Sequence, residues 1–264
     1  MHEFFSMFEY AFMQRALIAG IIVALCAALL GVSLVLRRYA MIGDGLSHVA
    51  FGAVSVATAL HLSPLWVAIP VVMLAAVLLL AAGDREGKRG DASVAMLSTA
   101  SLAVGVLAMA GKGTDVYSYM FGSILAVRIE EMWLCLLLGA GVLVFFLLFR
   151  DRILSMTFDE SFARASGQHI GRIRLALALF TAVTVVLGMR LMGTLLISAL
   201  VLFPAMSAMR ICRRFGHVLV AAGIISVVCF AVGLCVSYWF DLAPGATVVS
   251  ANLAVYALLS LIRR

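Results

Sequence analysis

The sequence predicts an all-α, polytopic membrane protein with eight or nine transmembrane helices and one short cytoplasmic helix. Of its 264 residues, 65% are hydrophobic and only 12% are charged, with a mean hydropathy of +1.16, which is more apolar surface than a soluble core could bury. Apolar runs of about 20 residues, enough to cross roughly 30 Å of hydrocarbon as a helix, recur along the chain. The polar segments between them stay under roughly 25 residues, too short for a soluble domain. We therefore expect residues 1–264 to form a single transmembrane domain.

Four spans are expected in the first half of the chain. The first apolar run, residues 16–36, follows a segment without the basic leader of a cleaved signal peptide, so we interpret it as a retained span. The next three runs cover residues 42–60, 65–82 and 92–110. Residues 83–91 resemble a phosphate-binding loop only superficially, because the glycine spacing differs and Arg89 stands where Ser or Thr is required. We expect no nucleotide site there.

The second half contains four or five further spans. Residues 121–127 end a stretch that is too short and too polar to be assigned as a span. The remaining runs lie near residues 132–149, 175–188, 192–209, 217–240 and 245–262. Arg190 marks the expected break between the sixth and seventh spans, and this closely spaced pair could also form one interrupted element. The predicted total is therefore eight or nine.

The distribution of basic residues predicts the orientation. The formal net charge of +6 does not indicate nucleic-acid binding, because the basic residues are scattered in short loops between spans. If the longest polar segment, residues 150–174, is cytoplasmic and the spans alternate, fifteen of the nineteen Lys and Arg residues fall on the inner side. The positive-inside rule selects this arrangement. It places the N-terminus outside and the C-terminus in the cytoplasm, which requires an odd number of crossings and favours nine.

A polar interruption at residues 37–48 contains the chemically informative pair, Asp44 and His48. Four residues apart in a helix, the two side chains share one face and can meet at a single ion. A carboxylate and an imidazole suit zinc, manganese or ferrous iron. An intramembrane carboxylate costs at least about 2.5 kcal/mol unless it is paired or hydrated, so a functional role is favoured over simple packing or helix capping.

Two other functions could use the same residues. Asp44, Ser47 and His48 could form a hydrolase, but residues this close on one helical turn do not reproduce the separated members of a triad. An ion- or proton-driven carrier is the stronger alternative, because an intramembrane Asp–His pair can also relay protons.

The 150–174 segment contains a predicted short helix of about two turns. Thr157 or Asp159 is suited to capping its start, and Gly167 to closing it in the left-handed conformation. An apolar ridge follows helical spacing, formed by Phe158, Phe162 and Ala165. Such a ridge either lies back on the membrane ends of the spans or binds a partner.

Five sequence blocks, in order, carry a resemblance to a known family. They are residues 12–20, 31–48, 121–124, 192–196 together with 202–205, and 241–247. On these blocks the chain resembles the permease subunit of zinc/manganese/iron-type ATP-binding cassette importers over nearly its whole length. It departs at Met206-Ser207 and Ala243-Pro244, and neither departure removes a metal-capable residue.

The resemblance implies a function and a set of partners. The chain would be the permease subunit of an importer that moves zinc, manganese or iron across the bacterial cytoplasmic membrane. It would form a homodimer, join a cytoplasmic ATPase subunit that carries the ATP chemistry, and receive the ion from an extracytoplasmic metal-binding protein. The permease itself would be no enzyme and would hold no permanent cofactor. An ion- or proton-coupled secondary metal carrier is kept as the alternative.

The resemblance also assigns roles to particular residues. Asp44 and His48 would contact the metal, while Gly43, Ser47 and Pro204 would mark the pathway. Pro204 removes one backbone hydrogen bond from its helix, so its role could be a kink for gating or simple packing geometry. The ATPase-coupling helix would use Asp159, Phe162, Ala163, Ala165 and Gly167.

Overall fold

The computed structural model describes residues 11–86, 90–110 and 128–262, which form ten helices and no strand. The helices are α2 (Ala11–Leu36), α3 (Ile42–Ala59), α4 (Pro64–Glu86), α5 (Gly90–Met109), α7 (Ile129–Phe158), α8 (Glu160–Ala165), α9 (Ile170–Met192), α10 (Thr194–Ile211), α11 (Phe215–Phe240) and α12 (Pro244–Ile262). Seven of the helices in this part of the chain are long and apolar enough to cross a membrane. The predicted all-α, multi-pass membrane class is therefore confirmed.

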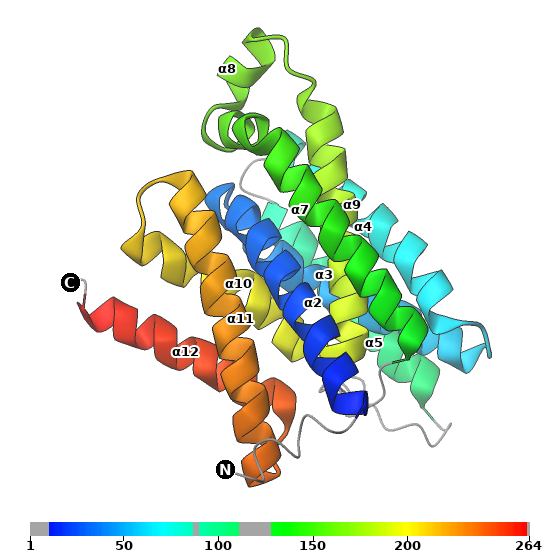
Figure 1. Cartoon of the computed structure of the whole chain (residues 1–264). Coiled ribbons are helices and arrows are strands. Elements are labelled where there is room, and N and C mark those ends of the chain that lie inside the picture. The colour runs from blue at the N-terminus through cyan, green and yellow to red at the C-terminus, as the bar shows by residue number, and fades with distance from the viewer. Residues whose placement is uncertain (1–10, 87–89, 111–127, 263–264) are drawn as a thin grey trace.

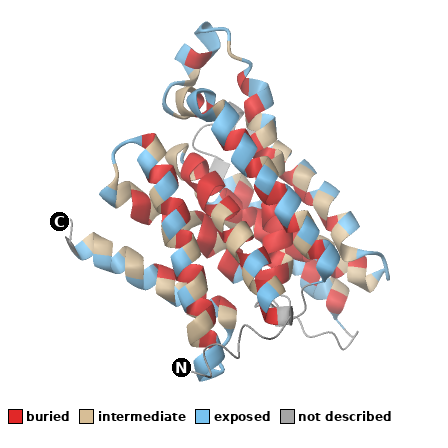
Figure 2. Cartoon of the chain, in the orientation of Figure 1, coloured by how far each residue is buried: buried red, intermediate tan, exposed pale blue. Residues whose placement is uncertain are grey.

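Helix α2 lies inside the bundle, in contact with α7, α9, α10 and α11 (Figure 1). Its buried face is built from small residues such as Ala19 and Ala27, and the buried residues concentrate along this helix and its neighbours (Figure 2). A Cβ atom on Gly31 would lie 2.0 Å from the carbonyl oxygen of Val201 in α10. Only glycine permits this close crossing of α2 and α10, a packing mode common between membrane helices.

A tight turn joins α2 to α3. Arg38 adopts a φ of +65°, and the Tyr39 N–H donates to the Leu34 carbonyl at 2.9 Å while the Arg38 N–H donates to the Val35 carbonyl at 3.0 Å. This is the Schellman pattern that ends helices. It reverses the chain, so that α3 begins beside the end of α2 and packs against α4, α5, α9 and α10.

Helix α7 is longer than the sequence indicated. The predicted span ended at residue 149, but the helix continues to Phe158, and α9 already starts at Ile170. The extension is stable because Ile153 and Met156 are fully buried within an otherwise polar stretch. Thr157 consequently lies inside α7, where its hydroxyl donates to the Ile153 carbonyl at 2.6 Å, and does not cap the next helix.

The break between α9 and α10 falls at Gly193, which has a φ of +88°, and not at Arg190. Arg190 lies in the last turn of α9, where its Nε is 2.8 Å from Oε1 of the buried Glu131 in α7. A basic residue is favourable at a helix C-terminus, and this one also ties α9 to α7. The weakly apolar residues 121–127 lie outside the described residues.

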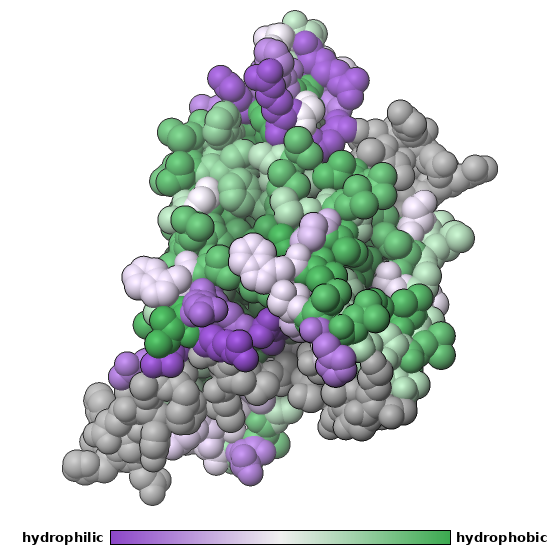
Figure 3. Space-filling model, turned by 90° about the vertical axis from the view of Figure 1, so that its right-hand side faces the viewer, coloured by the Kyte–Doolittle hydropathy of each residue, from purple (hydrophilic) through white to green (hydrophobic). Residues whose placement is uncertain are grey.

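The surface has the character of a membrane protein. Hydrophobic residues cover the middle of the face shown in Figure 3, and hydrophilic residues gather at the end that carries α8. The chain has three tryptophans, and all of them are exposed. Trp66 lies at the start of α4, Trp133 at the start of α7 and Trp239 at the end of α11. Tryptophans in such positions mark a membrane–water boundary.

Candidate functional site

Asp44 lies in the first turn of α3, inside the bundle. Val201 of α10 is the nearest neighbour of both Gly31 in α2 and Gly43 in α3. Gly31 is five residues before the end of α2, so the first turn of α3 sits about 8 Å inside that end. Gly43, one of the predicted signature residues, has no side chain, so α3 can pack closely against Val201. Through this packing Gly43 positions Asp44.

The carboxylate of Asp44 faces two neighbours, Ser198 of α10 and His48 of its own helix. The Ser198 hydroxyl donates to Oδ1 at 3.0 Å, and Oδ2 lies 3.8 Å from His48 Nε2. The second distance is too long for a hydrogen bond. Metal–ligand bonds of about 2.0–2.2 Å allow two ligand atoms on one ion to lie up to roughly 4 Å apart, so the spacing leaves room for a shared ion.

The side chains of Asp44 and His48 are both partly exposed at the surface of the protomer. The Asp44 side chain is 45% exposed and that of His48 is 22% exposed. His48 Nδ1 is buried and forms no hydrogen bond to the described part of the chain. Among the described residues, no group of three or more His, Cys, Asp or Glu side chains could hold a metal ion. In the described part of the chain, Asp44 and His48 therefore have no third side chain of these types with which to hold an ion.

Hydroxyl groups connect α3 to α10 beneath this pair. Ser47 is fully buried, and its hydroxyl donates to the Asp44 carbonyl at 2.7 Å and lies 3.3 Å from the Ser198 hydroxyl. Ser47, predicted as a signature residue, thus stabilises the first turn of α3. Ser198 was not predicted from the sequence as a site residue, and it lies between the two parts of the fourth block, residues 192–196 and 202–205.

Pro204 is buried inside α10, which continues past it to Ile211. It lies six residues beyond Ser198, or about 9 Å further along the helix. The structure therefore places it away from the Asp44 carboxylate, on the same helix.

The predicted short helix is α8, at the junction of α7 and α9. Asp159 caps it by accepting a hydrogen bond from the Phe162 N–H at 2.9 Å, and Gly167 after it has a φ of +75°, as the sequence indicated. Its six residues make fewer than the expected two turns. Ala163 is fully buried, whereas Phe158 and Phe162 are 68% and 63% exposed. Ala165 is also exposed. The two phenylalanines therefore do not lie back on the spans.

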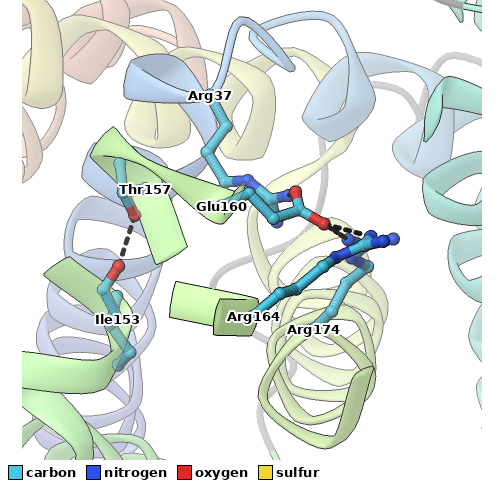
Figure 4. A network of polar contacts seen from close by, with 6 residues as sticks. All are labelled: Arg37, Ile153, Thr157, Glu160, Arg164 and Arg174. Atoms are coloured by element: carbon cyan, nitrogen blue, oxygen red, sulfur yellow. Dashed lines mark hydrogen bonds and ion pairs between the residues drawn. The ribbon is translucent and has the colours of Figure 1, made fainter. Parts of the chain in front are cut away.

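Glu160 in the first turn of α8 binds three arginines (Figure 4). Arg37, which follows α2, contacts Oε2 at 3.1 Å; Arg164 of α8 contacts Oε1 at 2.6 Å, and Arg174 of α9 also contacts Oε1. The Arg37 and Arg174 side chains are only 9% and 16% exposed. This cluster, the Glu160 network, ties α8 to the α2–α3 turn and to α9. It was not predicted, because Arg37 lies 123 residues from Glu160 in the sequence.

Comparisons with known proteins identify the family of the chain. Residues 9–264 match the model of the ABC 3 transport family. The chain is 31% identical over 254 residues to the "Probable metal transport system membrane protein" of Treponema pallidum, covering 96% of each. It is 28% identical over 258 residues to the manganese transport system membrane protein MntC of Halalkalibacterium halodurans, covering 97% of this chain and 88% of that one. The solved structure of PsaBC from Streptococcus pneumoniae in complex with Fab superposes with a TM-score of 0.86 at 26% identity, covering 98% of this chain and 94% of that chain.

Ten helices in the described part of the chain, seven of them long and apolar enough to cross a membrane, define a polytopic membrane protein. The chain belongs to the ABC 3 transport family. The predicted resemblance to ATP-binding cassette permeases is thereby confirmed.

Proposed function

We propose that this chain is the permease subunit of an ATP-binding cassette importer that carries a divalent transition metal ion, manganese or zinc, across the bacterial cytoplasmic membrane. The Asp44–His48 pair carries the proposal, because it is a carboxylate and an imidazole left partly exposed inside the bundle of an ABC 3 permease. Both ligand types suit manganese, zinc and ferrous iron. The relative named for manganese transport favours manganese among these ions.

Two copies of the chain complete the site in this proposal. One protomer supplies Asp44 and His48, whereas a zinc ion in proteins usually takes four ligands. In a two-fold homodimer the same surface of each subunit meets its equivalent, so two exposed pairs would face each other across the pathway. The Ser198 hydroxyl donates a hydrogen bond to Oδ1 of Asp44, so Oδ2, the oxygen nearer His48, remains available to the ion. Because the ion is cargo, coordination that is incomplete in either protomer alone favours its release.

The orientation follows from the same basic residues that the sequence singled out. The ends of α2, α7 and α10 that lie toward α8 carry a large set of arginines, namely Arg37, Arg38, Arg150, Arg152, Arg210, Arg213 and Arg214. We place this end in the cytoplasm, with nine crossings that add α3 and α4 to the seven apolar helices. Cysteines introduced at Glu86 and His169 should then react with an impermeant reagent only from the cytoplasm. Reaction of either cysteine from outside intact cells would reverse the orientation.

In this orientation α8 is the coupling helix for a cytoplasmic ATPase subunit. The exposed Phe158 and Phe162 supply an apolar contact that nothing in the described part of the chain covers. The Glu160 network links that helix to Arg37, seven residues before Asp44. Movement of α8 on ATP binding would therefore reach the turn that positions α3. An extracytoplasmic metal-binding protein would deliver the ion at the opposite end.

Transport measurements separate this function from the secondary-carrier alternative. Proteoliposomes containing the permease with its ATPase should take up Mn²⁺ only when ATP is supplied to the ATPase side, and an ion gradient alone should drive no uptake. Gradient-driven Mn²⁺ uptake by the permease without the ATPase would identify a carrier instead.

A further inference from the structure

An apolar groove lies on the outer surface, between α2, α7 and α11. Its volume is about 750 Å³. Its lining is mostly aliphatic and includes exposed side chains such as Leu147 and Val220, which are 79% and 62% exposed. It is separate from the Asp44–His48 pair and from α8, because neither contributes a lining residue.

The groove has the length of one membrane leaflet. Along α11 its lining residues run from Gly216 to Val228, a rise of about 18 Å in a helix. Half of a hydrocarbon core of roughly 30 Å is about 15 Å. The groove therefore runs from one membrane–water boundary, at the start of α11, to about the middle of the bilayer.

Two basic side chains, Arg150 and His217, line the boundary end of the groove. A Cβ atom on Gly216 would lie 2.4 Å from Arg150 Nη2, so this glycine makes the space in which the guanidinium rests against the start of α11. Arg150 has no carboxylate within ion-pair distance in the part of the chain that the structure describes. Two further exposed arginines, Arg213 and Arg214, precede α11. The groove is thus apolar along its length and positively charged at one end.

We propose that this groove binds an anionic phospholipid, with its phosphate at Arg150 and His217 and an acyl chain between α7 and α11. A second copy of the chain is a poorer occupant, because a two-fold contact would bring this arginine cluster against its equivalent. In the proposed orientation the groove lies in the cytoplasmic leaflet, where anionic lipids concentrate and basic pockets between helices bind their head groups. The proposal extends beyond metal transport, and its test measures lipid and not metal.

The test is native mass spectrometry of the purified full-length permease, presented with equal amounts of phosphatidylglycerol and phosphatidylcholine. Wild type should retain phosphatidylglycerol preferentially. Arg150→Gln should lower that retention about fivefold, the factor expected for one basic residue near an anionic surface. Arg152→Gln is the matched control, because Arg152 is exposed on the same helix, lies over the Phe149 ring and does not line the groove.

A second pair of variants tests the apolar part of the groove. Val220→Trp should fill the groove and release the lipid, whereas Val144→Trp, at a 53% exposed position of α7 outside the groove, should not. Equal retention of the two lipids by wild type, or equal behaviour of Arg150→Gln and Arg152→Gln, would overturn the proposal. Loss of the dimer mass in Val220→Trp with unchanged lipid retention would show that a second copy covers the groove, and would overturn it as well.

Discussion

Glu160 and Asp44 are both carboxylates with basic neighbours, but their surroundings differ, and the difference supports a structural role for Glu160 and the proposed ligand role for Asp44. Glu160 is met by three arginines from three parts of the chain and is 28% exposed. Asp44 has one serine at 3.0 Å and a histidine at 3.8 Å, and its side chain is 45% exposed. A carboxylate satisfied within the protomer holds helices together, whereas one left under-coordinated inside a span is available to an ion.

The largest effect is expected at Asp44. Asp44→Asn keeps the shape of the side chain but removes the charge, and metal uptake by the complex should fall at least about 100-fold, since even residues that only orient a metal ligand are typically worth 10–100-fold. His48→Ala should act in the same direction. Expression and dimer assembly should be unchanged, because Asp44 makes no ion pair with another helix among the residues that the structure describes.

Asp241→Asn provides the matched control for that substitution. Asp241 is exposed after α11 with a φ of +50°, a conformation that asparagine also tolerates. Metal uptake by the complex carrying Asp241→Asn should equal that of wild type. Wild-type manganese and zinc uptake in both Asp44→Asn and His48→Ala would mean that the pair is structural.

The next largest effect concerns α8. Phe162→Asp places an unpaired charge on the exposed surface that we assign to the ATPase contact, so the ATPase should bind about 30-fold more weakly, which corresponds to roughly 2 kcal/mol. Phe162→Leu retains the apolar contact, so this variant should bind the ATPase subunit nearly as tightly as wild type does. Copurification of the two subunits measures the difference. Normal copurification and uptake in Phe162→Asp would remove α8 from the interface.

Glu160→Gln tests the other carboxylate. It leaves the partly buried Arg37 and Arg174 without their common counter-charge. At this partial exposure the free energy that stabilises the contact should fall by about 1–3 kcal/mol. We expect ATP-driven uptake to fall about tenfold, the factor that corresponds to roughly 1.4 kcal/mol. Glu130→Gln, at an exposed carboxylate in the first turn of α7, serves as the control. Unchanged ATP-driven uptake in Glu160→Gln would mean that the Glu160 network does not transmit the coupling.

Ser198→Ala should have the smallest effect of the series. It removes a hydrogen bond to a half-exposed carboxylate, worth about 1 kcal/mol, and should reduce the metal affinity of the complex roughly fivefold. Ser198→Thr keeps a hydroxyl and should recover most of the loss. If alanine and threonine give the same affinity, the Ser198 hydroxyl does not position Asp44.

Local pattern was sufficient to predict much of the fold. The second span was expected at residues 42–60 and α3 is Ile42–Ala59, since a Schellman turn precedes it and the apolar run ends before Pro64. The cap at Asp159 and the left-handed Gly167 were also predictable from residue type. The extension of α7 was not, because average hydropathy hides the buried face of Ile153 and Met156.

The contacts that define the two carboxylate sites could not be predicted from local pattern. Ser198 is 154 residues from Asp44, and Arg37 is 123 residues from Glu160. No spacing rule relates residues so far apart, since it is the packing of α3 against α10, and of α2 against α7, that brings them together. The Asp44–His48 pair was found from the sequence because its members lie one turn apart on one helix.

The most direct measurement is the amount of Mn²⁺ held by the purified complex, counted by the loss of the free Mn²⁺ signal in electron paramagnetic resonance. Wild type, Asp44→Asn and Glu160→Gln are compared side by side. We expect Glu160→Gln to bind Mn²⁺ like wild type, because its carboxylate serves the helices and not the ion, and Asp44→Asn to bind at least about tenfold more weakly. Wild-type Mn²⁺ binding by Asp44→Asn, or equal loss of binding in both variants, would contradict the assignment of Asp44 as the metal ligand.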